Sequence, residues 1–152
     1  MVDVSAKASS RRVARAEALF RLEPEVRRQL LAGELRKGEA LAVARVAGIQ
    51  AAKETSRLIP LCHPIALSHA AVDFAAVAED GILIRTEAVT TGPTGVEMEA
   101  LAAATVAGLT LYDMCKSACR EARLEQIRLV HKSGGKSGTW NATVEPTTGD
   151  AL

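Results

Sequence analysis

The pattern of apolar and polar positions predicts four strands along the chain. Residues 13–20 (VARAEALF) place alternate residues on opposite sides, which indicates a strand, although a helix stays compatible with this stretch. Residues 71–77 and 82–89 are also strand-like, and residues 78–81 (AEDG) between them predict a hairpin turn. Residues 125–130 (EQIRLV) predict the last strand.

Three other stretches have apolar residues at helical spacing. Residues 24–33 begin with a proline that a first helical turn tolerates and end at a glycine, and residues 39–58 predict a second helix. Residues 95–119 predict one long helix of small and apolar residues. The order strand, helix, helix, strand, strand, helix, strand is close to the split βαβ pattern. We therefore expect an α+β, ferredoxin-like fold, in which helices pack on one face of an antiparallel sheet.

The length of 152 residues predicts a single domain over residues 1–152, and the candidate residues described below make it a catalytic domain in our interpretation. No internal repeat or low-complexity linker divides the chain. Glycine and polar residues dominate its last part, so we expect a flexible C-terminal tail from about residue 139.

Composition narrows the class of partner. The chain has nineteen Lys and Arg residues and eighteen Asp and Glu residues, so it is nearly neutral, and only four residues are aromatic. Both features argue against a nucleic-acid partner. Three cysteines fit free thiols in a reducing compartment better than a disulfide framework. Neither a signal peptide nor a membrane span is recognisable, so we expect a cytoplasmic protein.

Four charges stand out in the long apolar helix: Glu97, Glu99, Asp113 and Lys116. Ionised groups are rarely buried unless they are paired or functional, which suggests a catalytic element. Asp113 and Lys116 are three residues apart and share a face. Among apolar neighbours we expect this pair to be partly buried, so that Lys116 favours ionised Asp113 while desolvation makes Lys116 a better proton donor.

Two loops carry further candidates. In LIPLCHP, Pro60 and Pro64 hold His63 on a stiff extended segment, although a connector with a locally hydrogen-bonded histidine is equally compatible. The segment KSGGKSG (residues 132–138) invites a phosphate, but Val130 stands where the Walker pattern needs glycine. A lysine-bearing phosphate loop and a mobile linker both remain open.

Two lysines outside these loops are weaker candidates. Lys37 in LRKG precedes the second helix, where a cation suits an anion site, although a solvated link is the simpler interpretation. Lys53 lies inside that helix and has the pattern of an exposed lysine. No pair of Cys or His residues has zinc spacing, and no structural metal is expected.

Spacing along the long helix suggests a shared site. Glu99 and Asp113 lie within about 40° of each other around the axis but roughly 21 Å apart along it. If two copies packed antiparallel across a two-fold axis near Val106, Glu99 of one copy would approach Asp113 of the other. We expect a close crossing at the small residues Ala102, Ala103, Ala104, Ala107 and Gly108.

Six segments together resemble the cyclic pyranopterin monophosphate synthase family of molybdenum-cofactor biosynthesis. They are MVDVSAKA (1–8), ARVAGIQAAK (44–53), LIPLCHP (58–64), TGVEMEAL (94–101), LYDMCK (111–116) and KSGGKSG (132–138). The resemblance implies a lyase that converts 3′,8-cyclo-7,8-dihydroguanosine 5′-triphosphate to cyclic pyranopterin monophosphate and releases pyrophosphate. It also implies a ferredoxin-like fold and a homo-hexamer built as a trimer of dimers, with sites at a dimer interface. No resident cofactor is expected, and whether Mg²⁺ accompanies the triphosphate stays open.

The resemblance also implies roles for individual residues. Asp113, Lys116 and Lys37 match catalytic residues. The matching substrate-binding residues are Leu61, Cys62, His63, Glu97, Met98, Glu99, Lys53, Lys132 and Lys136, with His63 and the lysines expected near the phosphates and Met98 and Glu99 near the base-derived ring. The alternative from another class is a non-catalytic nucleotide-binding regulatory domain, which would need the anion contacts but no Asp–Lys pair.

Overall fold

Four long strands form an antiparallel sheet in the computed structural model, which describes residues 1–78, 80–143 and 150–151. They are β1 (Ser10–Arg21), β2 (His69–Val77), β3 (Gly81–Gly92) and β4 (Arg123–Ser133). Two-residue strands extend the sheet at its edges, β5 (Trp140–Asn141) beside β4 and β6 (Asp150–Ala151) beside β2. The order in the sheet is β5-β4-β1-β3-β2-β6.

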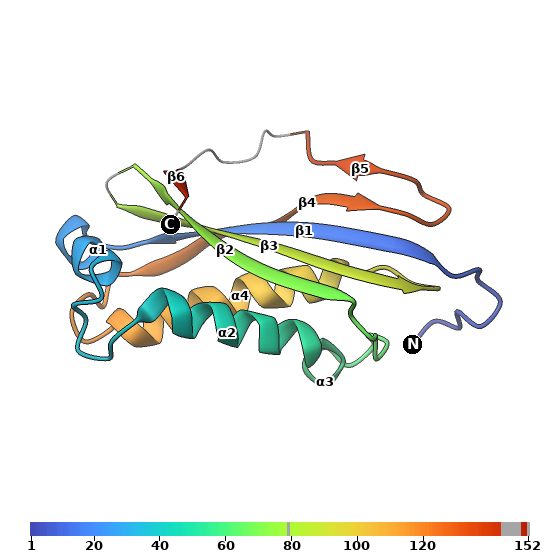
Figure 1. Cartoon of the computed structure of the whole chain (residues 1–152), viewed down its shortest axis with the longest axis horizontal. Helices are drawn as coiled ribbons and strands as arrows, with labels where there is room; N and C mark the ends of the chain where they lie inside the picture. Colours follow the sequence, from blue (N-terminus) through green and yellow to red (C-terminus); the bar gives the residue numbers. More distant parts are fainter. Residues whose placement is uncertain (79, 144–149, 152) are drawn as a thin grey trace.

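The helices are α1 (Pro24–Leu31), α2 (Ala40–Lys53), α3 (Thr55–Leu58) and α4 (Glu97–Cys115). Figure 1 shows α2 and α4 side by side on one face of the sheet, where α4 packs on β1, β3 and β4 and α2 packs on β2. The predicted α+β fold with an antiparallel sheet and helices packed against it is confirmed.

Two predicted helix boundaries are wrong. The helix expected over residues 39–58 ends at Lys53 and resumes as α3, because Glu54 between them has φ −105° and ψ 8°, which departs from helical geometry. The helix expected over residues 95–119 spans Glu97–Cys115.

The alternation in β1 decides which residues form the core. Ala14, Ala16, Ala18 and Phe20 are buried on the helix side of the sheet, whereas Arg15 points to the opposite side and pairs with Glu87 of β3. Directly paired residues of neighbouring antiparallel strands point to the same side of the sheet. The same alternation therefore continues into β3 and β2. The helix layer therefore covers a continuous apolar surface.

Small residues allow α2, α4 and the sheet to approach closely within one chain. A Cβ added to Gly48 of α2 would lie 2.9 Å from the carbonyl oxygen of Ala103, and one added to Gly108 would meet the side chain of Leu124 in β4. Ala104 and Ala107 are also fully buried. The expectation that Ala103, Ala104, Ala107 and Gly108 contact a partner chain is wrong, because these residues face the interior of their own chain.

The chain beyond residue 139 is described only in part. Trp140 and Asn141 pair with Lys132 and His131 as β5, while residues 144–149 and 152, which belong to the predicted tail, lie outside the described residues. Among the described helices, none is both long and apolar enough to cross a membrane.

Candidate active site

One carboxylate and two ammonium groups meet at the C-terminal end of α4. Lys116 Nζ lies 2.7 Å from Asp113 Oδ1, and Lys37 Nζ lies 2.5 Å from Asp113 Oδ2. Lys37 also donates to the Asp113 backbone carbonyl at 2.9 Å. Each carboxylate oxygen therefore accepts a hydrogen bond from one ammonium group. The three predicted catalytic residues thus form one cluster.

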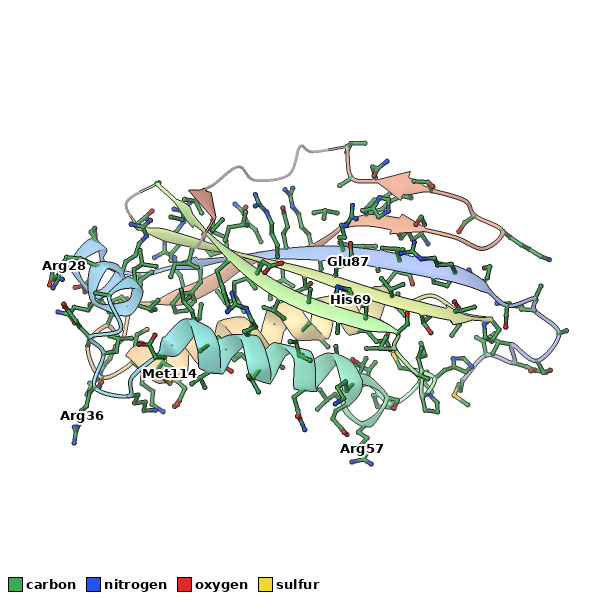
Figure 2. All side chains as sticks on the ribbon, viewed as in Figure 1. Arg28, Arg36, Arg57, His69, Glu87 and Met114 are labelled. Carbon is green, nitrogen blue, oxygen red and sulfur yellow. The ribbon has the colours of Figure 1, made fainter. Side chains whose placement is uncertain are left out.

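The loop between α1 and α2 brings Lys37 to this helix end. Leu35 is buried in the core, and its carbonyl accepts a hydrogen bond from the Gly38 N–H at 2.8 Å. Gly38 has φ +86°, a conformation that favours glycine and turns the chain into α2. Figure 2 shows Arg36 of this loop and Met114 of α4 at the same end of the molecule.

Ion pairing, rather than burial, sets the protonation of the cluster. Hydrogen bonds from Lys116 and Lys37 lower the pKa of Asp113 to about 2, and the bond to Asp113 raises the pKa of Lys116. The expected partial burial is wrong, because the Asp113 and Lys116 side chains are both 52% exposed on the solvent side of α4. Desolvation consequently does not make Lys116 more acidic; both groups are held in their charged forms.

A pocket of about 480 Å³ lies at the opposite end of α4. Its walls come from the N-terminal segment, the loop after α3 and the start of α4. All six residues predicted from the motifs LIPLCHP and GVEME to bind substrate line it: Leu61, Cys62, His63, Glu97, Met98 and Glu99. The fold thus brings together two motifs that are more than thirty residues apart in the sequence.

The polar groups of this pocket have distinct environments. Nε2 of His63 is 2.8 Å from the Val2 carbonyl oxygen, so it donates a hydrogen bond there. The carboxyl group of Glu99 belongs to a residue that is only 3% exposed, and burial raises its pKa. Burial, followed by the nearby Glu99 charge, raises the pKa of the Cys62 thiol. A ligand in this pocket would meet a neutral thiol and a carboxyl group that takes up a proton readily.

Basic residues gather beside this pocket. Lys136 and Ser137 of the glycine-rich loop line a second cavity of about 560 Å³ together with Lys7 and Arg12. Lys132, near the end of β4 just before the loop, pairs with Glu97 of α4 at 3.1 Å. The basic lining of this second cavity suits an anionic group.

The two ends of α4 cannot serve one small ligand within one chain. Sixteen residues separate Glu97 from Asp113, which corresponds to roughly 24 Å of helix. The Asp113 cluster and the pocket are therefore two separate half-sites. In the described part of the chain, His, Cys, Asp and Glu side chains do not gather in a group that could hold a metal ion.

Comparison with known proteins identifies the family. The sequence profile of the MoaC family matches residues 1–135. The chain belongs to the MoaC family. It is 51% identical over 142 residues to the cyclic pyranopterin monophosphate synthase of Listeria monocytogenes serotype 4a (strain HCC23), with 93% of this chain and 89% of that relative covered. The enzyme of the same name from Listeria welshimeri serovar 6b is 50% identical over the same coverage. The resemblance noted in six segments is thus confirmed.

In this member of the MoaC family, one predicted residue lies apart from both half-sites. Lys53, at the end of α2, lines a neighbouring groove with Ser68 and His69. Ile65 lines both this groove and the pocket at the start of α4, so the two adjoin, but Lys53 does not line that pocket itself.

The sequence analysis missed Lys7 and Arg12. Lys7 lines both the pocket and the basic cavity, and Arg12 donates to the carbonyls of Gly92 and Pro93 while lining the cavity. Lys7 belongs to the segment MVDVSAKA, which resembles the family, and both residues belong to the basic stretch KASSRR.

Proposed function

We propose that this chain converts 3′,8-cyclo-7,8-dihydroguanosine 5′-triphosphate to cyclic pyranopterin monophosphate and releases pyrophosphate. Family membership makes the chain a lyase of molybdenum cofactor biosynthesis. The observation that carries the proposal is the pocket that gathers LIPLCHP and GVEME beside a basic cavity. A ring with an attached triphosphate has the same division into an uncharged part and an anionic part.

The basic cavity is the proposed site of the triphosphate. Lys7, Arg12 and Lys136 line it. Lys132 pairs with Glu97, which lines the adjoining pocket. His63 lines the adjoining pocket and would exchange its hydrogen bond to the Val2 carbonyl for one to a phosphate oxygen. Because pyrophosphate leaves with several negative charges, these cations would stabilise the leaving group. Lys53 would act only at the margin of this site.

The ring of the substrate is proposed to lie among Leu61, Cys62, Met98 and Glu99. Met98 is 37% exposed and offers an adaptable apolar surface. Glu99, whose raised pKa favours the protonated form, can donate a hydrogen bond to a ring atom or accept one after ionisation.

The Asp113 cluster is proposed to supply the proton transfers of ring opening and cyclic phosphate closure. Asp113 is ionised near neutral pH and fixes the two ammonium groups, so Lys116 and Lys37 are the proton donors of the cluster. A positioned acid or base typically accelerates such steps by roughly 10² to 10⁴. These assignments fit the catalytic roles that the family resemblance implies.

A second copy of the chain would complete each site. The outer surface of the helix layer exposes apolar side chains of α2 and α4, among them Val46 at 67% and Leu109 at 57%. An antiparallel crossing of two α4 helices over this surface would bring the Asp113 cluster of one copy to the pocket of the other. We propose this dimer as the unit of a hexamer, formed by a single catalytic domain. The three free cysteines suit a reducing cytoplasm.

The decisive experiment is incubation of the protein with the cyclised guanosine triphosphate, followed by measurement of pyrophosphate and of the pterin product. We expect stoichiometric formation of both. A nucleotide-binding regulator would bind the same compound without releasing pyrophosphate, and that result would remove the catalytic proposal.

A further inference from the structure

One ion pair lies at the junction of the substrate pocket and the basic cavity. Oε1 of Glu97 is 3.1 Å from Nζ of Lys132. Glu97 lines the pocket, and Gly95, two residues before it, lines both the pocket and the cavity. The carboxylate therefore holds a lysine at the place where ring and phosphates of the proposed substrate would join.

The absence of a side chain at Gly95 leaves room for the Glu97 carboxylate. A Cβ on Gly95 would meet Glu97 Oε2, so the Glu97 side chain folds back directly over the glycine. The side chains of Glu97 and Lys132 remain 31% and 34% exposed. The pair is thus well located but open, and an incoming anion can reach the ammonium group.

The pair also differs from the other acidic group of the pocket. Glu99 is buried with a raised pKa, whereas Glu97 has an ammonium partner and borders the phosphates rather than the ring. A carboxylate beside a polyphosphate repels it and competes with it for the same lysine. Such a group weakens the binding of anions. Its presence beside the phosphates therefore suggests a role in which weaker binding is useful.

We propose that Glu97 is a positioning residue that competes with pyrophosphate for Lys132 and so promotes release of this product. In the empty site Glu97 holds Lys132 at the junction. When the triphosphate binds, the Lys132 ammonium group pairs with a phosphate instead of Glu97. After cleavage the ammonium group pairs with Glu97 again as pyrophosphate dissociates. The inference rests on the proposed function and assigns Glu97 to the turnover of the product rather than to recognition of the ring.

Calorimetric titration with inorganic pyrophosphate alone tests the competition. Because a partly exposed ion pair contributes at most about 1 kcal/mol, Glu97→Gln should bind pyrophosphate about two- to fivefold more tightly than the wild type. In a Lys132→Gln background the same change should have a clearly smaller effect. Glu121→Gln, an exposed carboxylate change elsewhere in the chain, controls for net charge and should leave the affinity unchanged.

Rapid-quench kinetics with the triphosphate substrate supplies the second readout. Glu97→Gln should show a burst of pyrophosphate formation followed by a slower steady state, because product release becomes limiting. Unchanged or weaker pyrophosphate binding by Glu97→Gln, or an equal effect in the Lys132→Gln background, would overturn the inference. Tighter binding without any turnover by the wild type would instead contradict the proposed function and leave the competition established.

Discussion

Two carboxyl groups on one helix have opposite environments. Glu99 is buried and its pKa is raised, whereas Asp113 lies between two lysines that lower its pKa to about 2. Divergent pKa values of this kind are typical of sites that separate acid, base and electrostatic roles. In this chain the difference suits Glu99 to hydrogen bonding with the ring and Asp113 to permanent negative charge.

Asp113→Asn should abolish turnover and leave substrate binding largely intact. The neutral amide keeps the shape but no longer holds Lys37 and Lys116 by charge, so we expect kcat to fall at least about 100-fold. Single-turnover rates and a binding isotherm measured on the same preparation separate the two effects. Asp73→Asn, on the opposite face of the sheet, is the matched control, and a near-normal rate in Asp113→Asn would refute the role of Asp113.

Glu99→Gln should change how stability depends on pH. Burial raises the pKa of folded Glu99 above its ordinary value of about 4.5, so the folded state binds this proton more tightly than the unfolded state. The stabilisation is present at low pH and is lost as the pH rises through the folded pKa.

Glutamine stays neutral throughout, so the melting temperature of Glu99→Gln relative to wild type should rise as the pH increases above the ordinary glutamate pKa of about 4.5. Thermal unfolding scans at several pH values measure this difference. A difference that falls with pH would mean that ionised Glu99 is stabilised in the fold.

Among the elements, the strands were the most predictable part of the fold. The period-two pattern in residues 13–20 permitted a strand and left a helix open, and the structure has β1 there. For the loops, the sequence indicated which residues are candidates for the site but not which distant residues they contact. Nothing in LRKG indicates that Lys37 meets Asp113, which is seventy-six residues away, because the contact depends on how α1 and the buried Leu35 place the turn.

The glycine-rich loop offers an element-scale test with a built-in control. Gly134 has φ +96°, and a Cβ there would meet the carbonyl oxygen of Arg11 at 2.1 Å; Gly138 has φ +64° but open surroundings. Alanine at either position carries the left-handed backbone cost of about 1 kcal/mol. Only Gly134→Ala also displaces the loop from β1.

Gly134→Ala should therefore lower the melting temperature and weaken pyrophosphate binding more than Gly138→Ala does. Thermal scans and calorimetric titrations of both variants provide the comparison. Equal effects in the two variants would show that the close approach to Arg11 has no part in forming the anion site.

For the whole molecule, the spacing of Glu99 and Asp113 along one helix was enough to predict two half-sites. One small ligand cannot bridge Glu99 and Asp113, which are fourteen positions apart, and the structure keeps them at opposite ends of α4. The helix faces were harder to assign. Small residues pack equally well against a partner or inside one chain, and here Gly48 of α2 shows that they serve the interior. The exposed Val46 and Leu109 were not distinguishable from core residues by sequence.

Subunit complementation tests whether two copies form each site. His63→Ala damages the pocket and Asp113→Asn damages the cluster, so each variant alone should be inactive. In a mixed dimer one site combines the intact pocket of one copy with the intact cluster of the other. Random pairing of equal amounts makes half the dimers mixed, each with one intact site of two, so about a quarter of wild-type activity should return.

The control pairs Asp113→Asn with Lys116→Ala, two changes in the same half-site. Every site of that mixed dimer keeps one defective cluster, and no activity should return. Native mass measurement must show that mixed assemblies form in both experiments. Mixed assemblies without recovered activity, or a fully active monomer, would contradict the shared site, because the roughly 21 Å between Glu99 and Asp113 leaves a single chain no other way to bring its two half-sites to one substrate.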